Sequence, residues 1–180
     1  MKEMRLVYKF FKPTWYSNNF YNIDFVSIKN NKIDFILCDL DNTIVEHYVD
    51  LPNNKVVSII SLIKKLGIEF YLISNNKEDR VKKFCERINI KYLHSTKKPC
   101  TKKIKKFIKQ NNIDINKTLV IGDQILTDIW MANILKCRSL LVEPATNSDL
   151  FVTKFNRFAD KIIRKSLAKK GKLKSVERNQ

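Results

Sequence analysis

The stretch Ile33-Asp34-Phe35-Ile36-Leu37-Cys38-Asp39-Leu40-Asp41-Asn42-Thr43 decides the fold of this chain. Its first six residues are mostly apolar and predict a buried β-strand. Two carboxylates separated by one residue, Asp39 and Asp41, follow that strand directly. In open α/β sheets, ligands bind at the carboxyl ends of parallel strands. The stretch therefore predicts a strand that carries two acidic side chains to a functional edge of a sheet.

Short apolar runs and amphipathic segments alternate along the rest of the chain. Four further strands are predicted, at residues 68–73, 90–93, 119–121 and 139–142. Amphipathic helices are predicted between them: over 56–66, where Gly67 ends the helix, over 81–88, from Pro99 to 108, and over 128–135. This alternation predicts a Rossmann-like α/β domain, in which a parallel sheet carries helices on both faces.

Length and composition place the chain among ordinary globular domains. Its 180 residues suffice for one domain with a sizeable core and are too few for two catalytic domains. A hydrophobic fraction of 44%, with three Gly and four Pro, excludes disordered and collagen-like classes. No apolar run approaches the roughly 18 residues of a membrane span, and no signal peptide is recognisable. The four Cys show no zinc-like spacing, so we expect reduced, mostly buried thiols in a cytoplasmic protein.

A second acidic pair follows the fourth predicted strand, in the string Gly122-Asp123-Gln124-Ile125-Leu126-Thr127-Asp128. If this strand lies beside the first one, four carboxylates converge: those of Asp39, Asp41, Asp123 and Asp128. Like charges that close repel one another strongly unless a cation lies among them. Mg²⁺ suits such a site, because it binds few protein oxygens and completes its octahedron with water. The two pairs therefore predict a magnesium site.

Polar residues also close the second and third predicted strands. Ser74 and Asn75 end the second strand, and Lys98 follows the third after a short loop. A hydroxyl, backbone N–H groups, a lysine and Mg²⁺ around a nucleophilic carboxylate make a site for phosphoryl transfer. Alone, Ser74 would be a helix cap and Lys98 one surface lysine among many; their spacing relative to the acids favours a role in the site.

These strings resemble, in order, the four motifs of the haloacid dehalogenase (HAD) superfamily, over roughly residues 33–145. The resemblance implies that Asp39 is the nucleophile and forms an aspartyl-phosphate. It implies that Asp41 is the general acid toward the leaving oxygen and then the base for the attacking water. Because the uncatalysed reaction is slower by up to about 10²¹-fold, loss of Asp39 would leave no measurable turnover.

The same resemblance implies how phosphate and metal are held. Thr43 and Ser74, with Asn75 beside them, would bind phosphoryl oxygens or shape the loop, and Lys98 would neutralise nucleophile and phosphate together. Mg²⁺ would be bound by Asp39, by Asp41 through its carbonyl, and by Asp123, with Asp128 in or behind that shell. The implied fold is a three-layer core around a parallel five-stranded sheet of order 5-4-1-2-3.

Spacing and further strings narrow the resemblance. The gaps from Asp41 to Ser74 and from Ser74 to Lys98 are too short for a cap domain, which favours large or surface-bound substrates over small enclosed metabolites. The strings Asp39-Leu-Asp-Asn-Thr-Ile-Val-Glu46 and Ile73-Ser-Asn-Asn76, with Thr153-Lys-Phe-Asn-Arg157, are similar to the YqeG-type branch of subfamily IIIA. That branch includes phosphatidylglycerophosphate phosphatases. The Thr153–Arg157 string has no derivable chemistry; a lid or headgroup role and simple packing both stay open.

The net charge of +17 is the outlier of the composition. Two lysine-rich blocks supply most of it: one spans residues 97–109, the other residues 161–178. Such charge favours a polyanionic partner, either nucleic acid or an anionic lipid surface. The alternative is the codon bias of an AT-rich genome, which explains Lys over Arg better than it explains so few acids.

The first 30 residues form an arm in which aromatic residues are interleaved with Lys2, Arg5, Lys9 and Lys12. Such an arm suits a lipid headgroup interface, although its rings could equally pack against the domain. We therefore divide the chain into an aromatic and basic arm (1–30), a phosphatase domain (31–160) and a basic tail (161–180). An open site flanked by basic segments predicts a cytoplasmic protein that attaches peripherally to the inner face of the cell membrane.

Three functions follow from these features. The first is a Mg²⁺-dependent phosphatase of phosphatidylglycerophosphate. The second is the same chemistry on a terminal phosphate of RNA or DNA, which the lysine-rich helix after Pro99 could track. The third is a basic module that binds RNA or the ribosome without catalysis. The intact set of Asp39, Asp41, Lys98 and Asp123 speaks against the third, since a binder has no need of mutually repelling acids.

Overall fold

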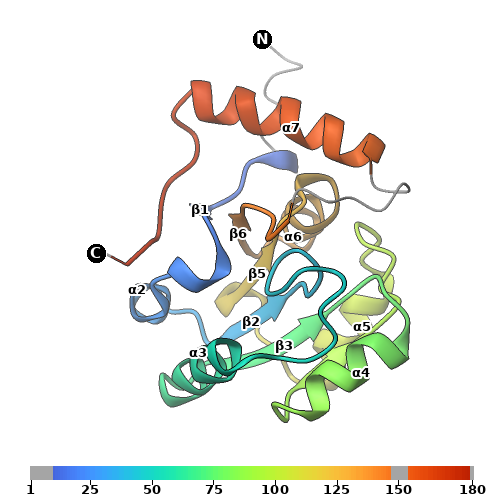
Figure 1. Ribbon diagram of the computed structural model, residues 1–180. Helices are drawn as coiled ribbons and strands as arrows, with labels where there is room; N and C mark the ends of the chain where they lie inside the picture. The colour runs from blue at the N-terminus through green and yellow to red at the C-terminus, as the bar shows by residue number, and fades with distance from the viewer. Residues whose placement is uncertain (1–9, 147–153, 179–180) are drawn as a thin grey trace.

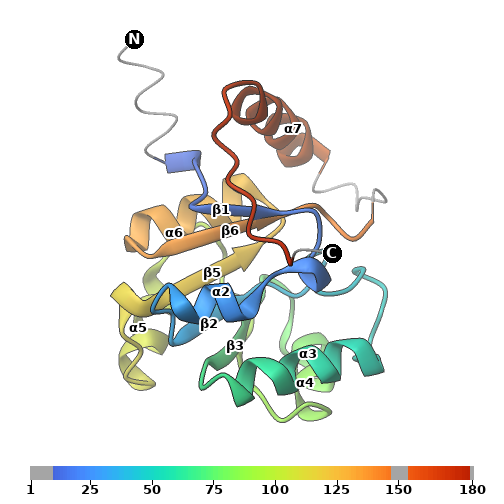
Figure 2. The ribbon, with the colours of Figure 1, turned by 90° about the vertical axis from the view of Figure 1, so that its left-hand side faces the viewer.

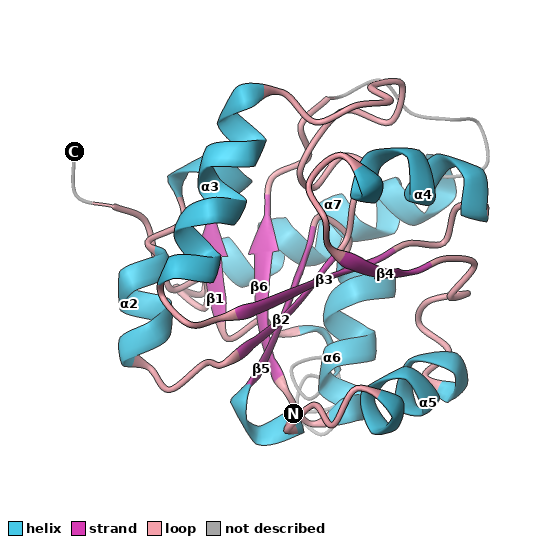
Figure 3. Ribbon diagram, turned by 90° about the horizontal axis from the view of Figure 1, so that it is seen from below, coloured by secondary structure: helices cyan, strands magenta, loops and turns pink. Residues whose placement is uncertain are grey.

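The computed structural model describes residues 10–146 and 154–178, and it forms three layers around a parallel sheet (Figures 1 and 3). The sheet contains β1 (Trp15–Ser17), β2 (Phe35–Cys38), β3 (Glu69–Ile73), β4 (Lys91–Leu93), β5 (Thr118–Gly122) and β6 (Arg138–Val142). The helices are α2 (Phe25–Asn30), α3 (Asn54–Lys65), α4 (Glu78–Glu86), α5 (Lys102–Gln110), α6 (Trp130–Leu135) and α7 (Lys154–Lys169). The predicted α/β class is confirmed.

The sheet order is β1-β6-β5-β2-β3-β4, with every pair parallel. The five predicted strands are β2 to β6, and they lie in the expected order 5-4-1-2-3. The number of strands differs, because β1 pairs with β6 through Trp15, Tyr16 and Ser17 and adds a sixth strand. Three residues with two aromatic side chains carry no alternation that would mark them as a strand, so this edge depends on tertiary contacts.

Alternate residues of the central strands face two different hydrophobic cores, one on each side of the sheet. Ile36 and Cys38 face one core, together with Ile28, Ile60 and Phe84 of α2, α3 and α4. Leu37 and Val120 face the other, against α5 and α6. This period of two is what a strand buried on both faces requires, and it explains the continuous apolar run from residue 35 to 38.

The segment set apart as an arm is built into the domain over the residues that the structure describes. Phe20 and Phe25 are 1% exposed, and their rings lie edge to face with centroids 5.7 Å apart. Trp15 and Tyr21 pack on the same core. Of the two alternatives for these aromatic residues, packing against the domain is the one observed. Tyr8 and the cations Lys2, Arg5 and Lys9 lie outside the described residues.

The segment set apart as a tail also contacts the domain. Helix α7 continues across the predicted boundary at 160, and Leu167 packs on Ile125, Ile129 and Leu141. Beyond the helix, the chain runs back beside β1, as Figure 2 shows, where the Tyr16 N–H donates to Lys174 O at 2.8 Å and the Val176 N–H donates to Tyr16 O at 3.0 Å. Residues 172–178 therefore cover the outer edge of the sheet.

None of the helices among the described residues is long and apolar enough to cross a membrane. The stretch from Asp41 to Lys98, which the structure describes throughout, contains only a flap, α3, β3, α4 and β4. No cap domain interrupts this stretch, as the motif spacing predicts.

Candidate active site

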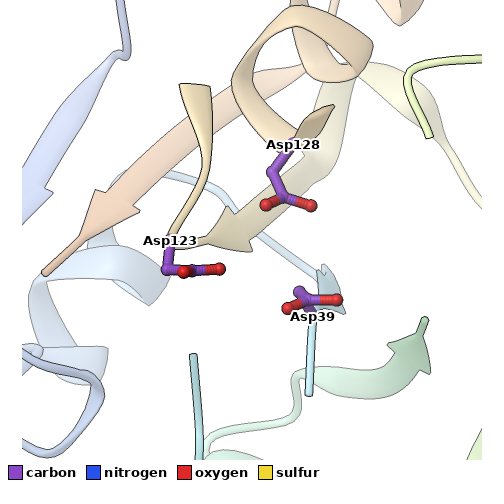
Figure 4. Close-up of side chains that lie close together, drawn as sticks. All are labelled: Asp39, Asp123 and Asp128. Atoms are coloured by element: carbon purple, nitrogen blue, oxygen red, sulfur yellow. The ribbon is translucent and has the colours of Figure 1, made fainter. Parts of the chain in front are cut away.

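Three carboxylates meet at the carboxyl end of the sheet, where Figure 4 shows them turned toward one another. Asp39 follows β2, Asp123 follows β5, and Asp128 lies in the π-helix η3 (Ile125–Ile129). One oxygen from each lies within 4.8 Å of the others, and the three residues are 7%, 0% and 1% exposed. The pairing of β2 with β5 brings them together, because the Asp39 N–H donates to Ile121 O at 2.9 Å.

The fourth predicted acid is not part of this cluster. The carboxylate of Asp41 accepts hydrogen bonds from Asn76 Nδ2 at 3.0 Å, Arg80 Nη2 at 3.1 Å and Ser74 Oγ at 3.3 Å. The prediction that four carboxylates converge is therefore wrong in number. The physical reason is that donors from the loop after β3 and from α4 hold the side chain of Asp41. The predicted metal contact of Asp41 is through its backbone carbonyl, and the position of the side chain does not affect that prediction.

Lys98 is buried among the acids and offsets part of their charge. Its Nζ lies 2.5 Å from Asp39 Oδ1 and 2.7 Å from Asp128 Oδ1, and the residue is 6% exposed. Burial opposes its charge, but the carboxylates of Asp128 and Asp39 raise the pKa of Lys98 above its ordinary value. Burial raises the pKa of Asp39 well above its usual range, assisted by the charges of Asp128, Asp123 and Asp41 and opposed by Lys98.

The loop after β2 positions Asp39 through its own backbone. The N–H groups of Thr43, Ile44 and Val45 all donate to Leu40 O, so the chain turns sharply within five residues. Asn42 takes a left-handed conformation with φ 63°, which asparagine tolerates better than most residues. As a result, the Thr43 hydroxyl lies 3.1 Å from Asp39 Oδ2 and 3.2 Å from Asp123 Oδ1, and it links the two acids.

Asn75 contacts the loop that carries Lys98. Its Oδ1 accepts from the backbone N–H of Lys98 and from Thr96 Oγ1, both at 2.7 Å, and its Nδ2 donates to Lys98 O at 3.5 Å. Thr96 also donates to Ser74 O at 3.0 Å. Side-chain hydrogen bonds therefore hold the end of β3 and the Lys98 loop together. Asn75 stabilises the position of this loop.

The second acidic loop depends on a close approach at Gly122. A Cβ at that position would lie 2.3 Å from Asp128 Cγ, a separation that real Cβ atoms do not show. Asp128 Oδ2 accepts from the backbone N–H of Gln124 and from Thr127 Oγ1, both at 3.2 Å. The glycine thus lets the carboxylate fold back over the end of β5, which is the reason for a glycine in this string.

The donor set suits a hard divalent cation. All three buried side chains offer carboxylate oxygens, which bind Mg²⁺, Ca²⁺ or Mn²⁺ in preference to softer metals. Lys98 is the one cation buried against Asp39 and Asp128 in the described structure, so negative charge remains in excess. The cluster therefore fits a divalent metal ion, which Asp39, Asp123 and Asp128 would hold.

Four polar residues around these side chains have no role predicted from the sequence, although one of them, Asn76, ends the string Ile73-Ser-Asn-Asn76. Asn76 and Arg80 hold Asp41 from the end of β3 and from α4. Asp160 and Arg164 of α7 reach the loop of Asp123 from far along the chain. Only the i, i+4 spacing of Asp160 and Arg164 is visible in the sequence as a signal.

A hollow lies by the start of β3 and β4, at the opposite edge of the sheet from the acids. It is lined by Lys64, Gly67, Ile68, Glu69, Phe70, Tyr71, Asn89, Ile90 and Lys91.

Comparison with known proteins gives relatives in sequence and in structure. The model of a family described as "Mitochondrial PGP phosphatase" matches residues 3–145. "Probable phosphatase YqeG" of Bacillus subtilis is 34% identical over 171 residues, which cover 94% of this chain and 98% of that protein. Similarity of this extent shows common family membership.

Solved structures share the fold at low sequence identity. The cobalt-bound deoxy-D-mannose-octulosonate 8-phosphate phosphatase of Haemophilus influenzae superposes with a TM-score of 0.52 and 12% identity, covering 78% of this chain and 92% of that one. An uncharacterised protein of Listeria monocytogenes serotype 4b gives a TM-score of 0.51 and 12% identity, covering 74% and 99%. These two likenesses show the fold alone.

Proposed function

The chain belongs to the mitochondrial PGP phosphatase family, within the HAD phosphatases, and from this premise we propose that it hydrolyses the terminal phosphate of phosphatidylglycerophosphate with Mg²⁺ as its metal. The observation that carries the proposal is the pair of Asp39 and Lys98, 2.5 Å apart at the bottom of an acidic site. A lysine there neutralises part of the charge that would otherwise keep an anionic phosphate away from an anionic nucleophile.

The first step is proposed to be attack by Asp39. A carboxylate oxygen of Asp39 forms a bond to phosphorus, and the bond from phosphorus to the ester oxygen breaks. The leaving alkoxide takes a proton from Asp41, and an aspartyl-phosphate remains on Asp39. Asn76 and Arg80 fix the position of the Asp41 carboxyl group, apart from the buried cluster.

The second step returns the enzyme to its starting state. Asp41 takes a proton from a water molecule whose oxygen attacks phosphorus, and the bond to Asp39 breaks to release inorganic phosphate. The same residue thus serves as acid and then as base, as the reversal of proton transfer requires. Mg²⁺ held by Asp39, Asp123, Asp128 and the Asp41 carbonyl would offset charge on the phosphoryl oxygens during both steps.

The remaining predicted residues would bind the phosphoryl group. Lys98 and the Thr43 hydroxyl flank the Asp39 carboxylate on its two oxygens, which supports the proposal that both meet phosphoryl oxygens. Ser74 is 1% exposed and lies between Asp41 and the Lys98 loop, where its hydroxyl could donate to the same group. Asn75 would contribute by holding Lys98, in addition to any direct contact with phosphate.

A lipid substrate is supported by the absence of a cap domain between the motifs and by charge. The stretch between the motifs contains no cap, so a headgroup could reach Asp39 while its acyl chains stay in a bilayer. With a net charge of +17, the chain would concentrate at an anionic leaflet, where each nearby lysine contributes about 1 kcal/mol. We therefore propose peripheral attachment to the cytoplasmic face of the membrane.

The proposal is tested by phosphate release from purified protein. We expect release from phosphatidylglycerophosphate in mixed micelles, loss of release with EDTA, and recovery on adding Mg²⁺. Asp39→Asn should abolish release, whereas Glu86→Gln, which changes an exposed acid of α4, should leave it intact. Preference for a soluble sugar phosphate would reject the lipid substrate and keep the class of reaction.

A nucleic-acid substrate is the alternative, and α5 is the observation that favours it. Its lysines Lys102, Lys105, Lys106 and Lys109 are exposed on one short helix. Faster release from a 5′- or 3′-phosphorylated oligonucleotide than from the lipid would establish that alternative. Binding of RNA that survives Asp39→Asn, without phosphatase activity on any of these substrates, would favour a non-catalytic module.

A further inference from the structure

Helix α7 presents two large apolar side chains to the outside of the molecule. Phe158 is 67% exposed and Ile162, one turn later, is 56% exposed. The opposite face of the helix is buried through Asp160 and Leu167, so the orientation of α7 is set by packing. Figures 1 and 2 both show α7 as the outermost element at the top of the molecule. Phe158 and Ile162 therefore form an apolar spot on the outward-facing surface of α7.

Exposed lysines follow this spot along the chain. Lys161, Lys165 and Lys169 are exposed on the same helix, and Lys172 and Lys174 follow it. From residue 158 to residue 169 the sequence has one acid, Asp160, which is 3% exposed and faces inward. The outward face of α7 is therefore apolar and cationic together, without a carboxylate to balance it.

From this composition we infer that the outward face of α7 is a docking surface for an anionic lipid bilayer. Aromatic and aliphatic side chains flanked by lysines are what interfacial helices present to a membrane, where the rings enter the acyl boundary and the ammonium groups meet phosphate. Nucleic acid would gain from the lysines alone and would leave Phe158 and Ile162 without a partner. The inference deepens the proposed lipid substrate and rests on it.

The position of α7 would bring a bound bilayer close to the acids of the candidate active site. Arg164, on the inner side of the helix, donates to the backbone carbonyl of Asp123 and, at 3.0 Å, to that of Val142. The helix therefore lies directly against the carboxyl edge of the sheet, beside the candidate active site. A bilayer bound to α7 would be held beside that edge, within reach of a lipid headgroup.

Two other exposed surfaces, on α5 and α2, lack this combination. Helix α5 carries the second lysine block, but its apolar residues Ile104 and Phe107 are buried in the core. Val26 of α2 is 50% exposed, but its helix contributes one lysine, Lys29, which pairs with Asp34 at 2.7 Å. These two places provide matched controls for charge and for apolar exposure.

The experiment is vesicle sedimentation with the full-length protein. Vesicles of phosphatidylcholine with phosphatidylglycerol are compared with vesicles of phosphatidylcholine alone. We expect binding to the anionic vesicles, and at least about tenfold weaker binding for Phe158→Ser with Ile162→Ser. Lys161→Glu with Lys165→Glu should weaken binding by a similar factor or more. Val26→Ser and Lys105→Glu with Lys106→Glu are the matched controls and should bind as the unaltered protein does.

Several outcomes would overturn the docking surface. They are unchanged vesicle binding in the α7 variants, loss of binding in the α5 variant instead, self-association through α7 in sedimentation velocity, and RNA binding that depends on Lys161 and Lys165. Turnover of a water-soluble aryl phosphate should be equal in all variants, which also shows that they fold. Vesicle binding without hydrolysis of the lipid would reject the proposed substrate and leave the docking surface standing.

The inner face of α7 carries a second inference through different contacts. Asp160 accepts hydrogen bonds from the backbone N–H groups of Ile125 and Leu126, at 3.0 and 3.1 Å. Arg164 lies 3.5 Å from Asp160 Oδ2 and 2.8 Å from Glu143 Oε1, in addition to its bond with Asp123 O. We propose that Asp160 and Arg164 are positioning residues that hold the Asp123–Asp128 loop in the geometry that binds metal.

The arrangement explains how the loop from Asp123 through the π-helix η3 keeps its two acids in place. The first N–H groups of η3 have no partner within the helix, and Asp160 satisfies two of them. Arg164 fixes the carbonyl of Asp123 on the other side of the same loop. Both charged side chains are largely buried, so water offers no ready substitute for them.

The affinity for metal distinguishes a positioning role of Asp160 and Arg164 from a general contribution to stability. Mn²⁺ is titrated and its binding is followed by the electron paramagnetic resonance signal. We expect the affinity for Mn²⁺ to be at least about tenfold lower in Asp160→Ala and in Arg164→Met than in the unaltered protein. Asp160→Asn and Arg164→Lys should restore part of the affinity, and Lys165→Met on the outer face should have no effect. Equal Mn²⁺ affinity in folded Asp160→Ala, checked by circular dichroism, would overturn the proposal.

Discussion

The guanidinium of Arg80 binds the carboxylate of Asp41, with Nη2 3.1 Å from Oδ1. Asn76 Nδ2 binds the other oxygen at 3.0 Å, so one donor from the loop after β3 and one from α4 orient the side chain between them. Both charged groups are mostly buried, at 14% and 17% exposure. A carboxylate held this way cannot swing into the cluster of Asp39, Asp123 and Asp128. Arg80 thereby keeps the side chain of Asp41, the proposed acid and base, apart from the three clustered carboxylates.

Removal of this contact should affect turnover more than binding. Arg80→Met frees Asp41 to rotate, and a displacement of about 1 Å at a proton donor costs up to about a hundredfold in rate. We expect kcat for an aryl phosphate to fall by about ten- to a hundredfold, with KM changed little. Lys83→Met is the control, since Lys83 pairs with Asp50 in a largely exposed contact at 2.7 Å. Equal kinetics in Arg80→Met and Lys83→Met would contradict the role of Arg80.

Divalent cations should stabilise the fold. The cluster holds three buried carboxylates against one buried lysine, so a bound cation relieves repulsion that the unfolded chain does not feel. At about a hundredfold excess over Kd, linkage predicts a rise in Tm of about 5 to 10 °C. Differential scanning fluorimetry with Mg²⁺ and Mn²⁺ measures it. Asp123→Asn should lose most of the rise, and an undiminished rise in that variant would place the cation elsewhere.

Lys98 should be important for stability as well as for catalysis. Lys98→Met leaves Asp39 and Asp128 without their buried partner, and breaking such a pair costs about 3 to 5 kcal/mol. Urea unfolding without divalent metal should show this loss in the free energy of unfolding. Lys105→Met on exposed α5 should change it by less than about 0.5 kcal/mol. A near-neutral Lys98→Met would mean that the acids are protonated or otherwise neutralised.

Gly122 should not tolerate a side chain. Gly122→Ala places a Cβ 2.3 Å from Asp128 Cγ, so either the strand end or the acidic loop must move. We expect loss of metal-induced stabilisation together with a lower Tm. Gly171→Ala is the comparison, because that site is open and costs only the left-handed backbone at φ +60°, about 1 to 2 kcal/mol. If both variants retain the response to Mg²⁺, the close approach at Gly122 is not essential.

The cysteines should differ sharply in reactivity. Burial raises the pKa of Cys85 and Cys137 to about 12 and that of Cys38 well above its ordinary value, so at pH 8 these thiols stay protonated and inaccessible. Cys100 is exposed. A thiol reagent should therefore modify one cysteine in the native protein and four after denaturation. Cys100→Ser should abolish the native reaction; a second reactive thiol would contradict the burial of the other three.

Local pattern was sufficient for the order of elements and for the meeting of Asp39, Asp123, Asp128 and Lys98 at one edge of the sheet. Apolar runs predicted β2 to β6, and the acids after β2 and β5 marked the functional edge, because parallel strands present their carboxyl ends together. The burial of Lys98 beside Asp39 agrees with the motif order. All of these features depend on residues that are neighbours in sequence or on a topology that the alternation dictates.

Contacts between distant segments decided the rest. Asp41 is drawn away from the other acids by Asn76 and Arg80, and α7 reaches the Asp123 loop through Asp160 and Arg164, more than 30 residues away in sequence. Strand β1 forms because β6 offers it a free edge and because residues 172–178 cover its other side. A carboxylate or a short aromatic segment has several possible partners, and only packing in three dimensions selects among them.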